Sequence, residues 1–310
     1  MSKPRIGVAV GLVAVLAVTV AVVVAVRSGN RTAADPGVPH DVASPGGSTL
    51  PDGFTVPEGA QLIGTPLEYE TVDDGASSWT AILSVTGDPI ETWSAMLAEL
   101  FSVLRVPNDA SDALGCATYD VFFECVITRV RNEPAPATSL QVTLEMGPVP
   151  GDVTGQYSLI ASAQRTDTPT DLGSRPWSGG PAPSPPPARV RPGVGDPLAP
   201  ETVAYDGDNE RYVLLAGTEL LVQFSPGSVT GGFGVLLRVS PGADVQEIAA
   251  AYAEQARQFD APTRRRVTTN ENSTVYGYVP SGGAGGYQGE VYGLDSDSGD
   301  DYIYYTLFND

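Results

Sequence analysis

The sequence contains almost no lysine and almost no histidine. Lys3 is the single lysine and His40 the single histidine among 310 residues, and His40 lies in a stretch rich in proline, glycine and serine. Within one chain, this excludes Ser-His-Asp and Cys-His catalysis, Schiff-base lysines and Walker A phosphate loops, and histidine-rich metal sites. We therefore expect no cofactor.

Basic residues are scarce as well: 17 lysines and arginines stand against 37 acidic residues, which gives a formal net charge of −20. A surface this negative repels the phosphates of nucleic acids, so nucleic acid is not an expected partner. It also repels anionic lipid headgroups, so the folded region should stand off the membrane. Solubility alone accounts for such a charge, and binding of cations or of a basic partner is the alternative.

Only two cysteines are present, Cys116 and Cys125, and an even, low count is typical of compartments where disulfides form. A disulfide between them would close a short loop and stabilise the fold by about 2.5–3 kcal/mol in the chain-entropy model. The alternative is a redox-active dithiol, which usually has Cys-x-x-Cys spacing at the start of a helix. That spacing is absent, so a structural disulfide is predicted.

What the sequence does have is one long apolar run. Residues 6–26 contain no charged side chain, and a helix of 21 residues is about 31 Å long, which matches a hydrocarbon core of about 30 Å. The run predicts a single transmembrane helix after a short cytoplasmic tail at 1–5. A cleaved signal peptide is the alternative, but its apolar core normally has only about 7–15 residues.

The orientation of this helix is indicated by the long region on its C-terminal side. The basic residues that flank residues 6–26 are nearly balanced, so they decide little. A long C-terminal region after a first apolar segment is typical of a signal anchor, and its cysteines suit an oxidising compartment. We expect a single-pass protein of the cell membrane, with a cytoplasmic N-terminus and extracytoplasmic C-terminal domains.

Two segments rich in proline and glycine divide the rest of the chain. Residues 27–57 are polar and repeatedly broken by these two residue types, which is typical of a flexible tether. Residues 169–199 contain a run of three prolines, and proline-rich chains favour extended polyproline II. The second segment is therefore predicted to be a semi-rigid linker between two domains, at 58–168 and 200–310.

The two domains share a pattern that indicates two copies of one unit. Residues 79–85 and 233–239 both have the composition of buried strands, and each precedes an expected helix that starts with Asp-x-x-Glu. Such an aspartate accepts hydrogen bonds from backbone N–H groups of the first helical turn. The two pairs are Asp88 with Glu91 and Asp244 with Glu247.

Apolar residues at helical spacing come after each of these caps, and β-type patterns come after each helix. Each unit is thus predicted to be β-β-α-β-β-β, an antiparallel sheet with one helix packed on one face, and the fold class is α+β. The expected strands are 62–69, 79–85, 122–129, 139–145 and 157–163 in the first unit, and 212–224, 233–239, 274–279, 289–294 and 302–308 in the second.

The last expected strand, from Tyr302 to Phe308, carries apolar or aromatic residues on both faces. One face should meet the core of its unit. The other could meet the helix, the other unit or a ligand. Tyrosine is common both in binding surfaces and in ordinary sheets, and the ordinary sheet is the simpler interpretation.

The densest acidic cluster precedes that strand. Asp295, Asp297, Asp300 and Asp301 carry carboxylates, which are ligands for a hard cation such as Ca²⁺. The spacing begins as in an EF-hand loop, but the glycine comes one position early and the glutamate at the twelfth position is missing. Aspartate, serine and glycine are also standard turn residues. A metal site and a solvated turn are the two interpretations.

The one basic run is Arg264, Arg265 and Arg266, which lies after the second expected helix. Guanidinium groups can bind a phosphate or carboxylate of a partner. In so acidic a chain, ion pairs with the protein's own carboxylates are the alternative.

These patterns favour a non-enzymatic role. The scarcity of lysine beside abundant alanine, valine, glycine and arginine suggests a bacterial source. The leading hypothesis is a membrane-anchored extracytoplasmic binding or scaffold protein of a bacterial cell envelope, whose partners are the membrane, through residues 6–26, and an envelope protein. One alternative is a carboxylate-based enzyme or a Ca²⁺-dependent module. The other is an accessory or sensor subunit of a membrane complex.

Overall fold

The computed structural model describes residues 43–44, 46–104, 114–118, 123–131, 138–148, 157–166, 192–198, 212–224, 233–257, 262–280 and 287–309. The predicted cytoplasmic tail and transmembrane helix lie outside these residues. Within them, no helix has the length and apolar character needed to cross a membrane.

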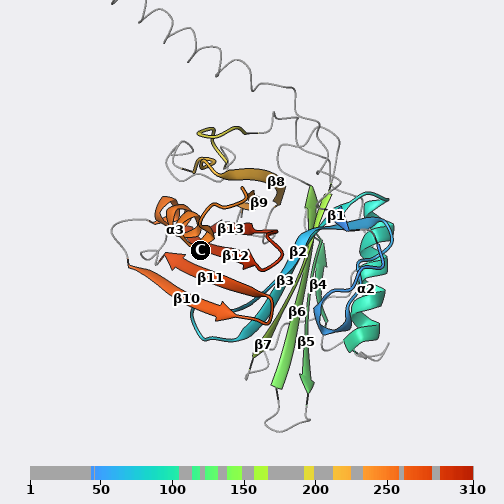
Figure 1. Ribbon diagram of the computed structural model, residues 1–310. Helices are drawn as coiled ribbons and strands as arrows, with labels where there is room; N and C mark the ends of the chain where they lie inside the picture. Colours follow the sequence, from blue (N-terminus) through green and yellow to red (C-terminus); the bar gives the residue numbers. More distant parts are fainter. Residues whose placement is uncertain are drawn as a thin grey trace, which may run out of the picture. The chain divides into compact units, whose positions relative to one another are not determined.

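The described chain folds into two antiparallel sheets (Figure 1). The first has the strand order β1-β2-β3-β7-β6-β5-β4 and the second the order β10-β11-β12-β13-β9-β8. The strands of the first are β1 (Ala43–Ser44), β2 (Ala60–Glu70), β3 (Ser77–Val85), β4 (Leu114–Thr118), β5 (Phe123–Arg131), β6 (Thr138–Pro148) and β7 (Tyr157–Thr166). Those of the second are β8 (Thr218–Phe224), β9 (Phe233–Val239), β10 (Thr263–Thr269), β11 (Ser273–Pro280), β12 (Tyr287–Ser296) and β13 (Tyr302–Asn309).

The two sheets have the same topology once the short strand β1 is set aside. In each, two strands precede a helix and four come after it, and the last strand returns to pair with the strand before the helix. Thus β7 pairs with β3 and β13 pairs with β9, both antiparallel. This agrees with the predicted α+β class and the predicted order, except that each unit has one more strand after its helix than expected.

The two additional strands, β4 and β10, have weak signals in the sequence. β10 reads Thr-Arg-Arg-Arg-Val-Thr-Thr and has no buried residue, so its pattern lacks the apolar alternation of a half-buried strand. β4 contains a glycine and is only five residues long. Both are edge strands, which have one hydrogen-bonded neighbour instead of two.

Each sheet has a helix that starts at the predicted cap (Figure 1). Helix α2 (Pro89–Leu104) begins after Asp88, whose Oδ1 accepts from the backbone N–H groups of Ile90 at 2.9 Å and Glu91 at 3.0 Å. Helix α3 (Val245–Ala256) begins after Asp244, whose Oδ1 accepts from the N–H of Glu247 at 2.9 Å. These bonds satisfy donors that have no partner inside the helix.

The helices cover one face of each sheet and form two separate cores. Trp93, Met96 and Leu100 of α2 are fully buried against the first sheet. In the second unit, glycine permits an especially close approach: a Cβ at Gly293 would lie 2.9 Å from Cγ1 of Val245 and 3.0 Å from Cβ of Ala249. Each core is therefore continuous between one sheet and its helix.

The first folded unit begins before residue 58, where the sequence placed its boundary. Leu50, Phe54 and Val56 are buried in the core beneath α2, and a 3₁₀ turn (Pro51–Gly53) lies between the first two. The second unit likewise includes Leu198, which is buried in the core beneath α3. The C-terminal ends of the predicted tether and linker therefore belong to the folded units.

The disulfide lies at the edge of the first sheet. Cys125 is disulfide-bonded and fully buried. Cys116 is the other cysteine of the chain and lies directly opposite it in the β4–β5 register. A bond between Cys116 and Cys125, which would link the edge strand to its neighbour, stays a prediction.

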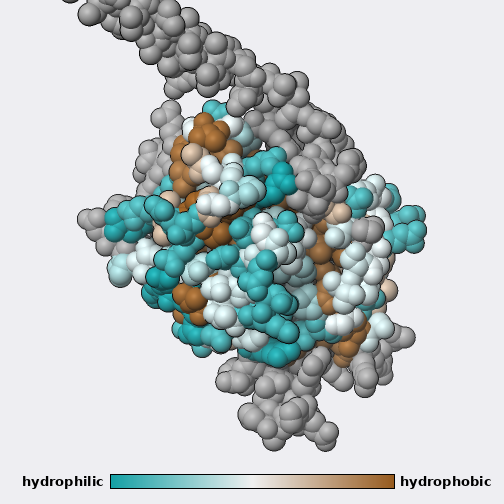
Figure 2. All heavy atoms as spheres, in the orientation of Figure 1, coloured by the Kyte–Doolittle hydropathy of each residue, from teal (hydrophilic) through white to brown (hydrophobic). Residues whose placement is uncertain are grey.

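The faces of the sheets that do not carry a helix pack against each other. A third cluster of buried residues combines Ile63, Leu67 and Ile82 of the first sheet with Leu236 and Tyr302 of the second. The described residues thus form the layers helix, sheet, sheet and helix. On the face drawn in Figure 2, hydrophilic residues predominate and hydrophobic ones are scattered in small groups.

Candidate functional site

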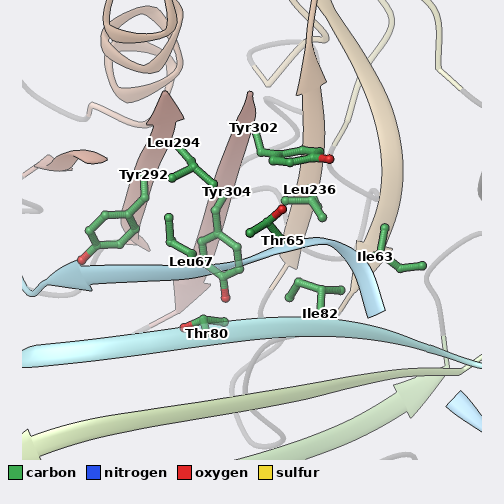
Figure 3. Close-up of a pocket in the computed structure, with 10 residues that line it drawn as sticks. All are labelled: Ile63, Thr65, Leu67, Thr80, Ile82, Leu236, Tyr292, Leu294, Tyr302 and Tyr304. Carbon is green, nitrogen blue, oxygen red and sulfur yellow. The ribbon is translucent and has the colours of Figure 1, made fainter. Parts of the chain in front are cut away.

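The apolar part of the contact between the sheets is close-packed. Figure 3 shows Tyr292, Tyr302 and Tyr304 lying between the second sheet and strands β2 and β3. The space left among these side chains is about 10 Å³, which is room for at most one water molecule. This region is a structural interface. It also accounts for both apolar faces of the last strand, because Tyr302 and Tyr304 face the other sheet while Ile303 faces α3.

Ion pairs join the two units beside this interface. Arg266 Nη1 lies 2.7 Å from Glu70 Oε2, and Arg264 pairs with Asp73. We call these four residues the clasp, since they link β10 of the second unit to the end of β2 and the turn after it. The Thr268 hydroxyl supports the clasp by accepting from the N–H of Glu70 at 2.9 Å.

The clasp accounts for most of the predicted arginine run. Arg264 and Arg266 pair with the protein's own carboxylates, and the Arg265 guanidinium lies 5.7 Å from the centroid of the Tyr278 ring. Arg264 and Arg266 therefore link the two units, whereas the contact of Arg265 lies within the second unit. Binding of a partner by the same run stays a prediction.

Next to the apolar interface lies a polar cavity of about 350 Å³, within the range of small-molecule sites. Both units form its walls: the turn after β2, strands β3, β6 and β7 of the first unit, and β12 of the second. Its ionisable and hydrogen-bonding side chains include Tyr69, Asp73, Asp74, Ser162, Gln164 and Glu290.

Glu290 is the ionisable side chain that β12 contributes to this cavity. It is partly buried, and burial raises the pKa of its carboxyl to about 7, with a further increase from the negative charge of Asp73. The Arg264 guanidinium and the Tyr292 hydroxyl oppose this increase without cancelling it. Glu290 is therefore about half protonated near neutral pH.

The two aspartates of the cavity, Asp73 and Asp74, lie in the exposed turn after β2. Asp74 accepts from the Thr71 hydroxyl and, at 3.0 Å, from the N–H of Ala76, and these bonds lower its pKa. Asp73 is 58% exposed and is paired with Arg264. The cavity thus has two aspartates at its exposed rim and a titratable carboxyl farther in.

Two tyrosines beside Glu290 stay protonated. The rings of Tyr69 and Tyr292 lie 4.3 Å apart between centroids, and burial raises the pKa of both hydroxyls. The Tyr69 hydroxyl is also 3.3 Å from Oγ1 of Thr80. These hydroxyls can take part in hydrogen bonds, but they cannot act as bases near neutral pH.

A second cavity of about 260 Å³ shares Tyr69, Ser78 and Ala163 with the first. Asp52 lies in its wall and accepts from Trp79 Nε1 at 2.9 Å and from Arg165 Nη2 at 3.1 Å. Asp52 has a φ of 56°, which is unusual for a residue other than glycine. Because this carboxylate is already satisfied, we assign it a structural role.

The predicted acidic cluster spans the end of β12, where Asp295 lies, and the turn before β13. Asp301 Oδ1 accepts from the N–H of Ser296 at 2.8 Å, and Gly299 adopts a φ of 81°. Asp295 has its pKa raised by burial and then by Asp301. Within the described residues, no group of three His, Cys, Asp or Glu side chains could hold a metal ion. Metal binding by Asp295, Asp297, Asp300 and Asp301 stays a prediction.

Sequence reasoning did not identify Glu290. The available signal was a single acidic residue within the mostly apolar and glycine-rich stretch 287–294, Tyr-Gln-Gly-Glu-Val-Tyr-Gly-Leu. An ionisable side chain at such a position faces either solvent or a polar or charged group that stabilises its charge.

Comparisons with known proteins do not assign this cavity a role. No protein family matches the sequence, and no curated protein does. Among solved structures, the chain has a weak likeness to a bifunctional dehydratase-cyclase domain in ambruticin biosynthesis. The two are 12% identical, with 80% of this chain and 96% of that chain covered at a TM-score of 0.16. A likeness at that score carries no argument.

Proposed function

We propose that this protein is a membrane-anchored binding protein of the extracytoplasmic side of a bacterial cell envelope, and that its ligand binds in the cavity between the two sheets. One observation carries the proposal: the cavity has the volume of a small-molecule site and is formed by residues of both units. The apolar interface and the clasp hold these two walls together.

The shared topology supports an origin of the two units by duplication. Two copies that first associated through equivalent sheet faces could then diverge separately, because they belong to one chain. One part of the shared face would keep its apolar packing, as at Ile82 and Tyr302. Another part would become polar, as at Ser162 and Glu290. A site between duplicated units is a common outcome, since pockets occur preferentially at domain interfaces.

The anchor belongs to the same proposal. A helix at residues 6–26 would hold the protein at the membrane, and the tether after it would let the folded units stand off an anionic surface. The net charge of −20 is consistent with that separation.

The test is a ligand screen by thermal shift on the full-length protein in detergent, with a variant that blocks the cavity. Ser162→Phe places an aromatic ring in the cavity wall, and Ser94→Phe adds the same ring at an exposed position of α2. We expect hits that stabilise the wild type and the Ser94→Phe control but not Ser162→Phe, since a ligand stabilises only the state that binds it. Hits that survive Ser162→Phe would place the site elsewhere, and a screen without any hit would count against a binding protein.

A second candidate function is hydrolysis by carboxylates. The observation that favours it is the Glu290 carboxyl, whose pKa of about 7 suits a general acid or base at neutral pH. Turnover of glycoside or ester substrates by the wild type, lost in Glu290→Gln and kept in a matched Glu271→Gln control, would support an enzyme. Tight binding without turnover would favour the binding protein.

A further inference from the structure

We infer that the cavity between the sheets binds a small organic cation through the carboxylate of Glu290, with the ring of Tyr69 and neutral oxygen atoms of β6 and β7 completing the site. This inference rests on the proposed binding function and names its ligand class. It is carried by the charges of the cavity wall, by the partners of each carboxylate, and by the neutral groups around Glu290.

The described residues that line the cavity include three carboxylates and no basic side chain. Arg264 offsets the charge of Asp73, so the negative charge of the wall that has no ion-pair partner comes from Asp74 and Glu290. The potential of such charge is concentrated where protein excludes water. An anionic ligand would be repelled from this site. A cationic ligand would be attracted and would offset the charge that the fold places there.

Of the three carboxylates, Glu290 is the one suited to meet a ligand. Asp73 pairs with Arg264, and Asp74 is held by the Thr71 hydroxyl and the Ala76 N–H. No ion pair within the described residues includes Glu290. The same carboxyl is half buried, and a buried carboxylate is costly unless a cation accompanies it.

The neutral part of the wall favours an organic cation over a metal ion. Ca²⁺ is bound by six to eight oxygen atoms, often from several carboxylates, and no cluster of that kind occurs within the described residues. An ammonium or guanidinium group needs fewer charges and uses neutral acceptors such as the Ser162 hydroxyl and the Gln164 amide oxygen. Tyr69 also lines the cavity, and cation–π attraction to its ring would add to the binding.

Binding of a cation should be linked to loss of a proton. The groups that act on Glu290 are Asp73, which raises its pKa, Arg264 and Tyr292, which lower it, and the uncharged hydroxyls of Tyr69 and Tyr304. A ligand cation would act as Arg264 does, but from inside the cavity. If only ionised Glu290 binds it, a carboxyl with a pKa of about 7 makes affinity about tenfold weaker at pH 6 than at pH 8.

The experiment is calorimetry on the full-length protein in detergent with three probes of nearly equal shape: benzamidine, benzamide and benzoate. Agmatine and choline extend the cation set, and CaCl₂ alone tests the metal. We expect the organic cations to bind, with about tenfold weaker affinity at pH 6 than at pH 8 and with release of a proton. Glu290→Gln should weaken them at least tenfold, since the amide has nearly the same shape without the charge. Glu271→Gln, an exposed control, should change nothing.

Three results would overturn the inference. If benzamide or benzoate binds as tightly as benzamidine, the site does not recognise positive charge. If Ca²⁺ displaces the organic cations, the ligand of the site is a metal ion. If cation binding is unchanged in Glu290→Gln, Glu290 is not the residue that binds the cation. In each case a block by Ser162→Phe would leave the proposed binding function standing, whereas an empty broad screen would refute both.

Discussion

Replacement of Glu290 by glutamine should change how the stability of the protein depends on pH. Burial raises the pKa of this carboxyl from 4.5 to about 7, so between those values the folded state holds a proton that the unfolded state has lost. Stability from this site is fully present below about pH 4.5 and is lost as pH rises through about 7. A shift of this size corresponds to about 3 kcal/mol.

The assay is urea unfolding of the full-length protein in detergent, followed by tryptophan fluorescence from about pH 5 to about pH 8. Over that range the wild type should lose about 2.5 kcal/mol through Glu290, and Glu290→Gln should not. The difference between the two unfolding free energies isolates this site, because carboxylates with lowered pKa such as Asp74 contribute equally to both. Glu271→Gln is the exposed control.

The reasoning would be refuted by a difference curve that is flat over this range. A carboxyl that has the same pKa in the folded and unfolded states gives such a flat curve. That result would mean that water reaches Glu290 freely, and the cavity wall would then lack the raised pKa on which the predicted pH dependence of cation binding rests.

Three further predictions concern the framework. Cys125→Ser should cost at least about 2.5–3 kcal/mol of unfolding free energy, measured as a lower urea midpoint, because it opens the loop between β4 and β5; a midpoint equal to that of the wild type would contradict this. Gly293→Val should destabilise the second unit by about 1–3 kcal/mol, seen as a lower Tm, because its Cβ would press against α3; an unchanged Tm would mean that the helix shifts freely. A double-mutant cycle on Arg266 and Glu70 should give a coupling below about 1 kcal/mol, since both side chains are about a third or more exposed; a larger coupling would make the clasp a principal source of stability.

Local signals in the sequence were sufficient for the strands next to each helix and for the helix starts. β9 was predicted with its observed bounds, because Phe233–Val239 is mostly apolar and lies between turn residues. Asp244 was identified as a cap because the capping bond joins residues three positions apart. In such cases the chain near a residue determines its structure.

Other features depend on residues far away in the sequence. β10 gave no strand signal, because its arginines are satisfied by carboxylates about 190 residues earlier in the chain. Leu50 and Phe54 lie in a segment with the composition of a tether, and their burial depends on the sheet and α2. The environment of Glu290 depends on the distant turn that carries Asp73, because both residues line the same cavity and Asp73 raises the pKa of Glu290.

The packing of sheet against sheet has a consequence for how the protein is made. β7 ends at Thr166 and β13 at Asn309, so the first unit is synthesised about 140 residues ahead of the strand that carries Tyr302 and Tyr304. At about 5–20 residues per second, the apolar face around Ile63 and Ile82 stays uncovered for roughly 7–30 seconds. During synthesis, this face would be open to chaperones or to other nascent chains, and the yield of native protein would depend on how quickly the second half arrives.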